Sequence, residues 1–342
     1  MAEKFVVVRP FFQYTEGEDT SEIEQQELDA ANAELRVMPF NTEEERKEAL
    51  AAADGFLTAN FVTGEMVSWM PKTRAIVTTS HGYNGIDLDA CTEAGIPVTN
   101  TRYNEREVAT HAIGLMLAVC RRIGALHNQM ATGEWGRGWQ GELPPLYGET
   151  MGILGFGKIG RQTAKRAKAF DLHVIAHDPY VDPSIADLLN VELVEFDELF
   201  ERSDYLSVHV PQTEETTGIV NERTLSLMKR SAVLINTCRG PVVDEESLYN
   251  VLSAGRIRGA GLDVFEVEPT PKDNPMLQLD NVVLTPHIAG FSTQSVLTAR
   301  RLASHKMAQM LNGYFPQPLL NPDVRGHTRA GYKDSWSNAY RG

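Results

Sequence analysis

Three short apolar runs in the second half of the chain each lead to a residue that can take part in catalysis. The runs span residues 232–236, 259–265 and 281–285, and the reactive side chains that follow them are Arg239, Glu268 and His287. Runs of this length, rich in branched apolar residues and separated by helical patterns, are typical of buried parallel strands. Ligands bind beyond the carboxyl ends of such strands. The pattern therefore predicts that a guanidinium, a carboxylate and an imidazole gather at one sheet edge.

Length and composition indicate a soluble globular protein with two domains. The chain of 342 residues exceeds the length at which a single core keeps growing, and its apolar share of 42% is that of globular proteins. A formal net charge of −14 speaks against nucleic acid or an anionic membrane as a partner, since both bind clustered lysine and arginine. A small anionic substrate remains compatible, because it needs only a local basic pocket.

Cysteine usage and hydropathy favour a cytoplasmic location. Cys91, Cys120 and Cys238 have no metal-ligand spacing and cannot all pair, which suits a reducing compartment without a bound metal. The N-terminal apolar stretch is too short and too acidic for a secretory signal. No run approaches the roughly 18 apolar residues of a membrane span.

A glycine-rich turn in the middle of the chain predicts a dinucleotide site. Gly155, Gly157 and Gly160 form the pattern GxGxxG between an expected strand at 151–154 and a helix that begins near Lys158. The glycines permit a tight turn, close approach of the backbone to a pyrophosphate, and close packing of the helix on the strand. The helix N-terminus favours the negative charge of the pyrophosphate.

A carboxylate about twenty residues further on strengthens this interpretation. Asp178 follows an expected strand at 173–176 and would accept hydrogen bonds from the adenosine ribose hydroxyls. It would also repel a 2′-phosphate, and no arginine or lysine follows it in residues 177–181. The cofactor is therefore expected to be NAD rather than NADP.

Strands and helices alternate in two blocks of the chain. The first block is expected to hold strands at 5–8, 55–58 and 74–79 and helices at 22–35, 42–53 and 88–94. The second block holds strands at 151–154, 173–176 and 205–210 and the three runs described above. Long helical patterns at 105–124 and 293–311 join the blocks. The polar tail, 326–342, either frays or lies over the body.

The simplest architecture places the second block inside the first. Residues 104–294 would form a Rossmann-type doubly wound parallel sheet that binds NAD. Residues 1–103 and 295–342 would form a smaller, flavodoxin-like α/β domain.

Each candidate catalytic residue has an ordinary structural explanation when it is taken singly. Arg239 could be a surface arginine, Glu268 could lie in a solvated acidic loop, and His287 could be a hydrogen-bonded core histidine. Behind a dinucleotide-binding fold, the three together match the needs of hydride transfer to a 2-oxo acid. Arg239 would bind the carboxylate, His287 would act as the acid and base, and Glu268 would keep the imidazole protonated.

At these residues the chain resembles the D-isomer-specific 2-hydroxyacid dehydrogenase family. The matching segments are residues 152–160, 236–245, 261–269 and 284–290, and the resemblance extends over about residues 50–315. It implies an NAD-dependent enzyme that interconverts a 2-oxo acid and a D-2-hydroxy acid, a homodimer, and a substrate domain that closes on the nucleotide domain. It also implies that Asp263 contacts the carboxamide side of the nicotinamide, although a structural role for Asp263 stays open.

The expected contacts with cofactor and substrate follow from the motifs and this resemblance. The cofactor contacts are Gly155, Gly157, Lys158, Ile159, Gly160, Asp178, Val210, Pro211, Thr216, Thr237, Cys238, Arg239, Asp263, His287 and Gly290. The substrate contacts are His81, Gly82, Asn104 and Arg239.

Two segments depart from the family pattern. In the glycine-rich substrate turn, Ser80 replaces the usual first glycine, and His81 stands where a small or apolar residue is usual. His81 would either contact an anionic or hydroxylated substrate or bond to the loop backbone. At the start of the long helix, Thr110 stands where glutamate is usual, and Asn104 is a candidate substrate contact.

Other functions of the same fold remain open. Formate dehydrogenases resemble the chain around Asn104 and residues 170–173 but carry glutamine in place of Glu268. Phosphite dehydrogenases keep the three catalytic residues and have a basic residue near the position of His81. An NAD-sensing regulator, as in corepressors that share the fold, would not need the intact catalytic set. The identity of the 2-oxo acid is not determined, and Phe11, Phe12 and Tyr83 are candidate walls of its pocket.

Overall fold

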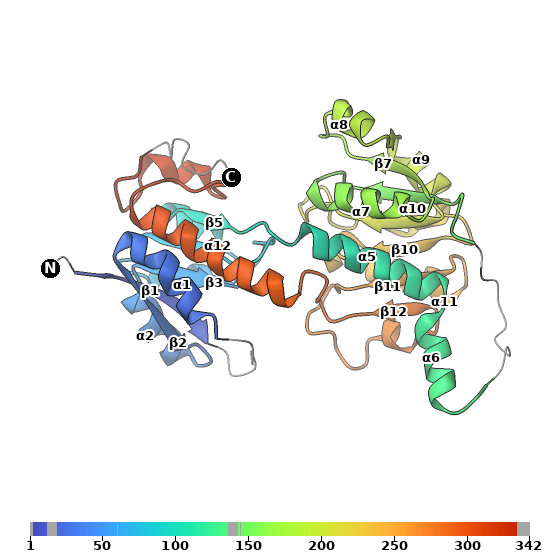
Figure 1. The fold of residues 1–342 in the computed structure, drawn as a ribbon. Coiled ribbons are helices and arrows are strands. Elements are labelled where there is room, and N and C mark those ends of the chain that lie inside the picture. Colours follow the sequence, from blue (N-terminus) through green and yellow to red (C-terminus); the bar gives the residue numbers. More distant parts are fainter. Residues whose placement is uncertain (1–2, 12–18, 60, 136–142, 144, 334–342) are drawn as a thin grey trace. The chain divides into compact units, whose positions relative to one another are not determined.

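The computed structural model describes residues 3–11, 19–59, 61–135, 143 and 145–333 (Figure 1). The chain divides into two compact units, of which the first comprises Met1–Tyr103 and Ser292–Gly342 and the second Asn104–Phe291. The chain thus returns to the first unit at Ser292, three residues before the expected boundary at 295. Ser292 belongs to the first unit because it caps a helix there by accepting a hydrogen bond from Ser295 N. Phe12, most of the expected loop at 133–145 and the end of the tail lie outside the described residues.

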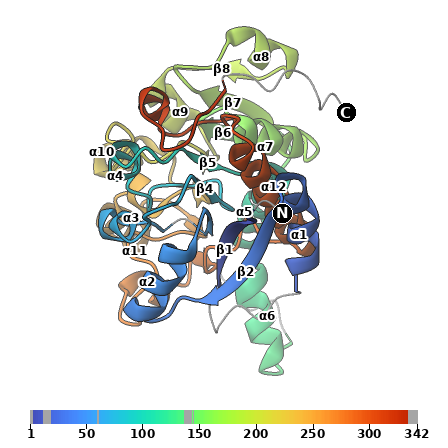
Figure 2. The same ribbon diagram turned by 90° about the vertical axis from the view of Figure 1, so that its left-hand side faces the viewer.

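The first unit contains a five-stranded parallel sheet in the order β2-β1-β3-β4-β5, which is the flavodoxin-like order. Figure 2 labels β1, β2, β4 and β5 of this sheet. Its strands are β1 (Phe5–Phe11), β2 (Ala33–Pro39), β3 (Gly55–Thr58), β4 (Ala75–Thr78) and β5 (Val98–Asn100). Its helices are α1 (Ser21–Leu28), α2 (Glu43–Ala52), α3 (Gly64–Ser68), α4 (Leu88–Glu93) and α12 (Thr293–Leu311).

Alternation along the strands gives this sheet two buried faces. Val7 and Leu57 pack with residues of α1 and α12, whereas their neighbours Val8 and Phe56 pack with residues of α2, α3 and α4. Successive side chains of a strand point to opposite faces, so each strand contributes to both cores. The result explains why these strands are apolar throughout.

The prediction of one helix in this unit was wrong for the second half of its range. The helix expected at 22–35 ends at Leu28 and continues only as a 3-10 turn to Ala31, and residues from Ala33 onward form β2. Asn32 takes the left-handed conformation, with φ 50°, which stops the helix and turns the chain into the strand. The strand β5 and the short helix α3 were also missed.

The second unit contains a seven-stranded parallel sheet in the order β12-β11-β10-β9-β6-β7-β8. Its strands are β6 (Thr150–Leu154), β7 (His173–His177), β8 (Glu192–Leu193), β9 (Tyr205–Val208), β10 (Val233–Asn236), β11 (Gly259–Leu262) and β12 (Val282–Leu284). Counted from β6, this is the strand order of a Rossmann fold with one added strand. The order reverses between β6 and β9, and ligands of such sheets bind at this switch point.

Helices cover both faces of the second sheet (Figure 1). They are α5 (Glu105–Cys120), α7 (Lys158–Lys168), α8 (Pro183–Leu188), α9 (Phe196–Arg202), α10 (Glu222–Leu227) and α11 (Glu245–Ser253), and a further helix, α6 (Ile123–Ala131), extends from the end of α5. Residues of α5, α7 and α8 pack in one core, and residues of α9, α10 and α11 pack in the other.

The long helix expected at 105–124 breaks before its predicted end. Arg122 has φ 53°, and α6 leaves α5 at a bend of 61°. In the part of the chain that the structure describes, no single helix is long and apolar enough to cross a membrane, and α5 with α6 meets that criterion only as a bent pair.

The described part of the tail lies over the first unit. Tyr314 forms a parallel bridge with Lys333, and the ring of Phe315 stacks on that of Tyr332 at a centroid distance of 4.8 Å. The hydroxyl of Tyr332 donates to the carbonyl of Arg74 at 2.8 Å. The chain up to Lys333 is therefore part of the folded unit.

Candidate active site

The three apolar runs form the neighbouring strands β10, β11 and β12, as predicted, although β11 ends at Leu262 and not at the expected Phe265. Their registers pair Asn236 with Leu262 and Leu262 with Leu284, so the three strands end level with one another. The loops that carry Arg239, Glu268 and His287 consequently leave the same edge of the second sheet.

Glu268 and His287 are in direct contact. His287 Nδ1 lies 2.6 Å from Glu268 Oε2, and Phe265 N donates to the other carboxylate oxygen at 3.0 Å. Both side chains are partly exposed, at 47% for the imidazole and 35% for the carboxyl. The carboxylate therefore holds the ring at Nδ1 and leaves Nε2 for proton transfer.

The turn that presents Arg239 is shaped by the last residue of β10. The buried side chain of Asn236 accepts a hydrogen bond from Cys238 N and donates to the carbonyl of Arg239, both at 3.0 Å. A Cβ atom at Gly240 would lie 1.9 Å from the backbone of Phe265. Only glycine allows this approach, which packs the arginine turn against the loop that leads to Glu268.

Cys238 has the environment of a structural thiol. Burial raises the pKa of Cys238 to about 12, and its Sγ lies 3.0 Å from Asn236 Oδ1. The side chain stays protonated at neutral pH and can donate to the amide oxygen.

Asp263 fixes the loop that carries His287. Its fully buried carboxylate accepts hydrogen bonds from Thr285 Oγ1 at 2.6 Å, Ile288 N at 2.8 Å and Ala289 N at 2.9 Å. His287 itself has φ 52° and donates its amide to the carbonyl of Asp263 at 2.7 Å. This arrangement favours a structural role for Asp263 over the expected contact with the nicotinamide.

A second histidine joins this network, and sequence reasoning gave it no role. His111 Nε2 lies 2.9 Å from Thr285 Oγ1 and 3.6 Å from Asp263 Oδ1. In the sequence, His111 is visible only as a polar residue of the expected helix at 105–124, and Thr285 only as the residue before Pro286. The separation of 174 residues along the chain hid the contact.

The glycine motif has the geometry expected for a pyrophosphate site. Gly155 directly follows β6 and has φ 94°, in the left-handed region that favours glycine. A Cβ at Gly160 would lie 2.2 Å from the carbonyl oxygen of Gly155, whereas the space beside Gly157 is open. Lys158 and Ile159 form the first turn of α7, and Lys158 Nζ lies 3.6 Å from Glu105 Oε1. The three glycines thus serve the turn, the approach of a ligand and the helix packing.

Asp178 is tied to the glycine motif at the end of β7. Its Oδ2 accepts from Phe156 N at 2.8 Å and its Oδ1 accepts from Tyr180 N at 2.9 Å. Each carboxylate oxygen can accept a further hydrogen bond, so ribose hydroxyls fit this position.

Replacing Asp178 with alanine should lower the preference for NADH over NADPH. We expect the ratio of kcat/KM values to fall at least about tenfold, since hydrogen bonds to a charged group contribute roughly 1.5–3 kcal/mol. Steady-state kinetics with both cofactors measure this ratio. Asp178→Asn is the control, because it keeps an acceptor without the charge, and an unchanged ratio in Asp178→Ala would contradict the assignment.

The other expected cofactor residues lie at the ends of β9 and β10. Val210 and Pro211 follow β9, and Thr216 Oγ1 donates to the carbonyl of Pro211 at 2.6 Å, which closes the loop. Thr237 is buried, and its hydroxyl has no hydrogen-bond partner among the described residues. A buried hydroxyl that lacks a partner is expected where a polar ligand binds.

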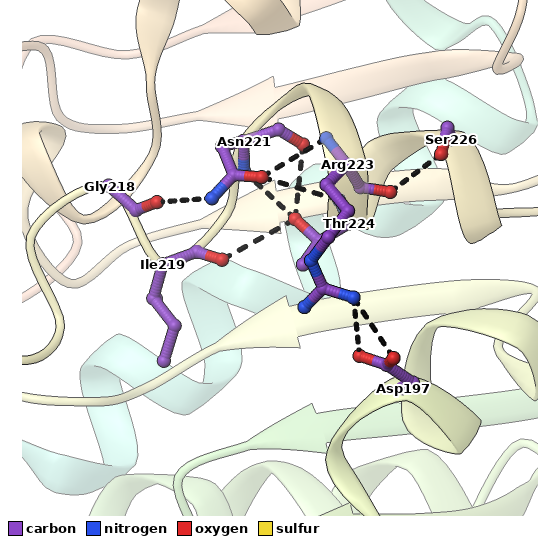
Figure 3. Close-up of polar contacts among 7 residues, drawn as sticks. All are labelled: Asp197, Gly218, Ile219, Asn221, Arg223, Thr224 and Ser226. Atoms are coloured by element: carbon purple, nitrogen blue, oxygen red, sulfur yellow. Dashed lines mark hydrogen bonds and ion pairs between the residues drawn. The ribbon is translucent and has the colours of Figure 1, made fainter.

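The far end of this loop is anchored by the cap of α10 (Figure 3). The side chain of Asn221 accepts from the amides of Arg223 and Thr224 and donates to the carbonyl of Gly218 at 2.8 Å. Arg223 binds both carboxylate oxygens of Asp197 at 2.9 Å, which joins α10 to α9. These contacts fix the end of the loop that bears Thr216, at the point where the chain enters α10.

Asn104 and Gly290 are in contact. Asn104 precedes α5, and its Nδ2 donates to the carbonyl of Gly290 at 3.3 Å. A Cβ at Gly290 would lie 2.1 Å from that nitrogen. The amide oxygen of Asn104 is buried and has no hydrogen-bond partner among the described residues.

The remaining predicted substrate residues, His81 and Gly82, follow β4 in the first unit. Asn100 donates its side-chain amide to the carbonyl of His81 at 2.6 Å, and Ser80 Oγ donates to the carbonyl of Gly82 at 2.6 Å. Lys306 in turn donates to the carbonyl of Asn100 at 2.7 Å. The turn is thus held by side chains of β5 and α12.

Comparison with known proteins identifies the family. Residues 113–289 match the NAD-binding domain of the D-isomer-specific 2-hydroxyacid dehydrogenases. The chain belongs to this family. The second unit is its NAD-binding domain, which agrees with the glycine motif and with the Rossmann strand order.

Two curated relatives of the family differ in their reactions. The chain is 38% identical over 292 residues to D-3-phosphoglycerate dehydrogenase of Methanocaldococcus jannaschii, with 84% of this chain and 55% of that protein covered. It is 40% identical over 273 residues to glyoxylate reductase of Thermofilum pendens, with 78% and 80% covered. The chain therefore spans about half the length of the first relative and four fifths of the second.

A solved structure shows the same fold with its ligands. D-lactate dehydrogenase from Aquifex aeolicus, complexed with NAD and lactic acid, has a TM-score of 0.78 to this structure at 28% identity. The match covers 90% of this chain and 96% of that one.

Proposed function

We propose that this protein catalyses the reversible reduction of a 2-oxo acid to a D-2-hydroxy acid, with NADH and a proton consumed and NAD⁺ released. The observation that supports it most is the contact of 2.6 Å between Glu268 Oε2 and His287 Nδ1 at the edge where Arg239 also lies. An imidazole whose Nδ1–H is held by a carboxylate can accept a proton at Nε2 and, once protonated, donate it from there, so it can act as base or acid.

Each residue has one task in this proposal. When bound, NADH supplies the hydride to the 2-oxo carbon. Arg239 binds the substrate carboxylate as a bidentate fork and polarises the carbonyl group. His287 gives a proton from Nε2 to the developing alkoxide, and in the oxidative direction it takes that proton back. Glu268 orients the ring and stabilises its positive charge.

Further contacts complete the proposed binding sites. His81, Gly82 and Asn104 contact the substrate, and the backbone N–H groups of the glycine-rich turn suit a carboxylate. NAD is bound by the glycine motif, by Asp178 and by the strand-end residues described above. We also propose a cytoplasmic location, since all three cysteines are unpaired.

The test of this function is the oxidation of NADH in the presence of a series of 2-oxo acids that differ in size and charge. Turnover with at least one acid supports the proposal. Binding of NADH without turnover of any acid would instead favour an NAD-sensing regulator. Formate or phosphite oxidation, measured as NAD⁺ reduction, covers the two other dehydrogenase reactions of this fold.

We propose that the enzyme is a homodimer formed through the second unit. A groove of about 1620 Å³ lies beside α6 and is lined by residues of α5, α6, α11 and β12. The helix α6 extends from the rest of its unit (Figure 1), and none of its residues is buried. Ile123 and Met130 are 55% and 49% exposed, and an interface formed by α6 would cover both.

The double substitution Ile123→Asp and Met130→Asp should convert the dimer to a monomer, because it places two charges in an apolar interface. Sedimentation velocity measures the change in mass. Leu188→Asp is the matched control, since Leu188 is an apolar residue of α8 that is 86% exposed. A wild-type protein that sediments as a single chain would refute the proposed dimer.

A further inference from the structure

We propose that the substrate is a 2-oxo acid with a large apolar or aromatic side chain, and that three exposed aromatic residues of the first unit bind this side chain. The inference rests on the proposed function and names the substrate class of the same site. The three residues are Phe11, Phe61 and Tyr83, which are 45%, 56% and 39% exposed.

These aromatic residues stand at the carboxyl ends of three adjacent strands. Phe11 ends β1, Phe61 follows β3, and Tyr83 follows β4, and the sheet order places β3 between β1 and β4. All three strands are parallel, so their carboxyl ends lie at one edge of the sheet. This is the edge where ligands of open α/β sheets bind.

The register brings the segments that carry these side chains together. Val8 pairs with Phe56, and the same register continued along β1 places Phe11 level with Ala59, two residues before Phe61. Beyond the strands, Val62 forms a parallel bridge with Ile86. The segments next to Phe61 and Tyr83 therefore run side by side.

Local hydrogen bonds fix the loops while their aromatic side chains remain exposed. Thr58 Oγ1 donates to the carbonyl of Phe61 at 3.2 Å, and Ile86 N donates to the carbonyl of Tyr83 at 3.0 Å. Val62 N donates to the carbonyl of Gly85 at 2.9 Å, which links the two loops. A rigid backbone with exposed aromatic rings is the arrangement expected of a binding surface rather than of a loosely folded loop.

The aromatic residues are continuous with the proposed substrate turn. Tyr83 directly follows His81 and Gly82 in the same loop. A substrate whose carboxylate is bound at this turn would extend its side chain into the neighbourhood of Tyr83 and Phe61. Apolar groups of the substrate would then lose contact with water against the aromatic rings.

The arginines near this edge show which alternative substrate the experiment has to separate from an apolar one. Arg9, on β1, is ion-paired with the fully buried Glu24 at 3.0 Å, and its side chain is only 11% exposed. Glu24 therefore offsets the charge of Arg9, and Arg300, on α12, also interacts electrostatically with both groups. Arg102, which is exposed after β5, is the cation that a phosphorylated substrate would be expected to use.

The experiment compares kcat/KM of the whole enzyme for phenylpyruvate and 4-methyl-2-oxopentanoate with the values for glyoxylate, hydroxypyruvate and 3-phosphohydroxypyruvate. We expect the two bulky apolar acids to exceed the three others by at least about tenfold. Phe61→Ala and Tyr83→Ala should each reduce that preference at least about threefold without changing the affinity for NADH. Tyr147→Ala, which removes an exposed aromatic residue of the second unit, should leave the preference unchanged.

The outcomes separate this inference from the function on which it rests. A preference for glyoxylate or hydroxypyruvate, or an unchanged preference in both aromatic variants, overturns the inference alone. A preference for 3-phosphohydroxypyruvate that Arg102→Ala abolishes also overturns it and assigns an anionic substrate. The absence of turnover with every acid overturns the proposed function and this inference with it.

Discussion

Replacing His287 with alanine should lower kcat at least about a hundredfold, because general acid catalysis by a positioned side chain contributes roughly 10²- to 10⁴-fold. The imidazole is the proton donor in the proposed reaction, and its Nδ1 lies 2.6 Å from Glu268 Oε2. The measurement is NADH oxidation with the best 2-oxo acid, together with the binding of NADH followed by its fluorescence. Cofactor binding should survive, since the glycine motif and Asp178 are unchanged.

Glu268→Gln provides the matched comparison for this prediction. It keeps a hydrogen bond to the imidazole but removes the charge that stabilises the protonated ring, so the loss of kcat should be smaller than in His287→Ala. Turnover of His287→Ala close to that of the wild type would contradict the assignment of the acid. Loss of NADH binding in that variant would show that its effect is not confined to proton transfer.

Replacing Asp263 with asparagine should destabilise the second unit by about 2–5 kcal/mol. In this fully buried site Oδ1 accepts from Thr285 Oγ1 and Ile288 N, and Oδ2 accepts from Ala289 N. An amide would place an NH2 group opposite the donors on one side, which leaves its own N–H and at least one of these donors without an acceptor. Each buried donor left without a partner costs roughly 1–3 kcal/mol. Because Ile288 N and Ala289 N are among these donors, the loop of His287 should loosen and kcat should fall as well.

Thermal unfolding followed by circular dichroism measures the stability change. A loss of this size in a unit of this length corresponds to a Tm lower by roughly 4–20 °C. Thr285→Val, which removes one donor and leaves the two amides bound to Asp263, should lower Tm by less. A Tm of Asp263→Asn within about 1 °C of the wild type would show that the carboxylate does not hold the loop.

Local patterns in the sequence were sufficient for the parts of the fold that depend on neighbouring residues. The strands before Arg239, Glu268 and His287 were predictable because continuous apolar runs between helical patterns favour buried parallel strands. The helix at 293–311 was predicted with the bounds that the structure shows for α12. The glycine motif was predictable because each glycine answers a steric need of one turn.

The sequence failed where a residue adopts a conformation that its type rarely takes. Asn32 and Arg122 have φ values of 50° and 53°, and each ends a helix that its sequence pattern would continue. Neither position carries a glycine, which is the usual signal for such an end. The strand β2 and the bend between α5 and α6 follow from these two residues.

The sequence by itself determined the family chemistry of this protein, since the cofactor motif and the three candidate catalytic residues each lie next to a strand that can be recognised locally. Only the tertiary structure decided how these residues are held. It placed Asp263 under the loop of His287, connected His111 to that loop through Thr285, and packed Gly240 against Phe265. These contacts join segments far apart in the chain, and no local pattern encodes them, because side-chain packing and buried hydrogen bonds are decided when the sheet assembles.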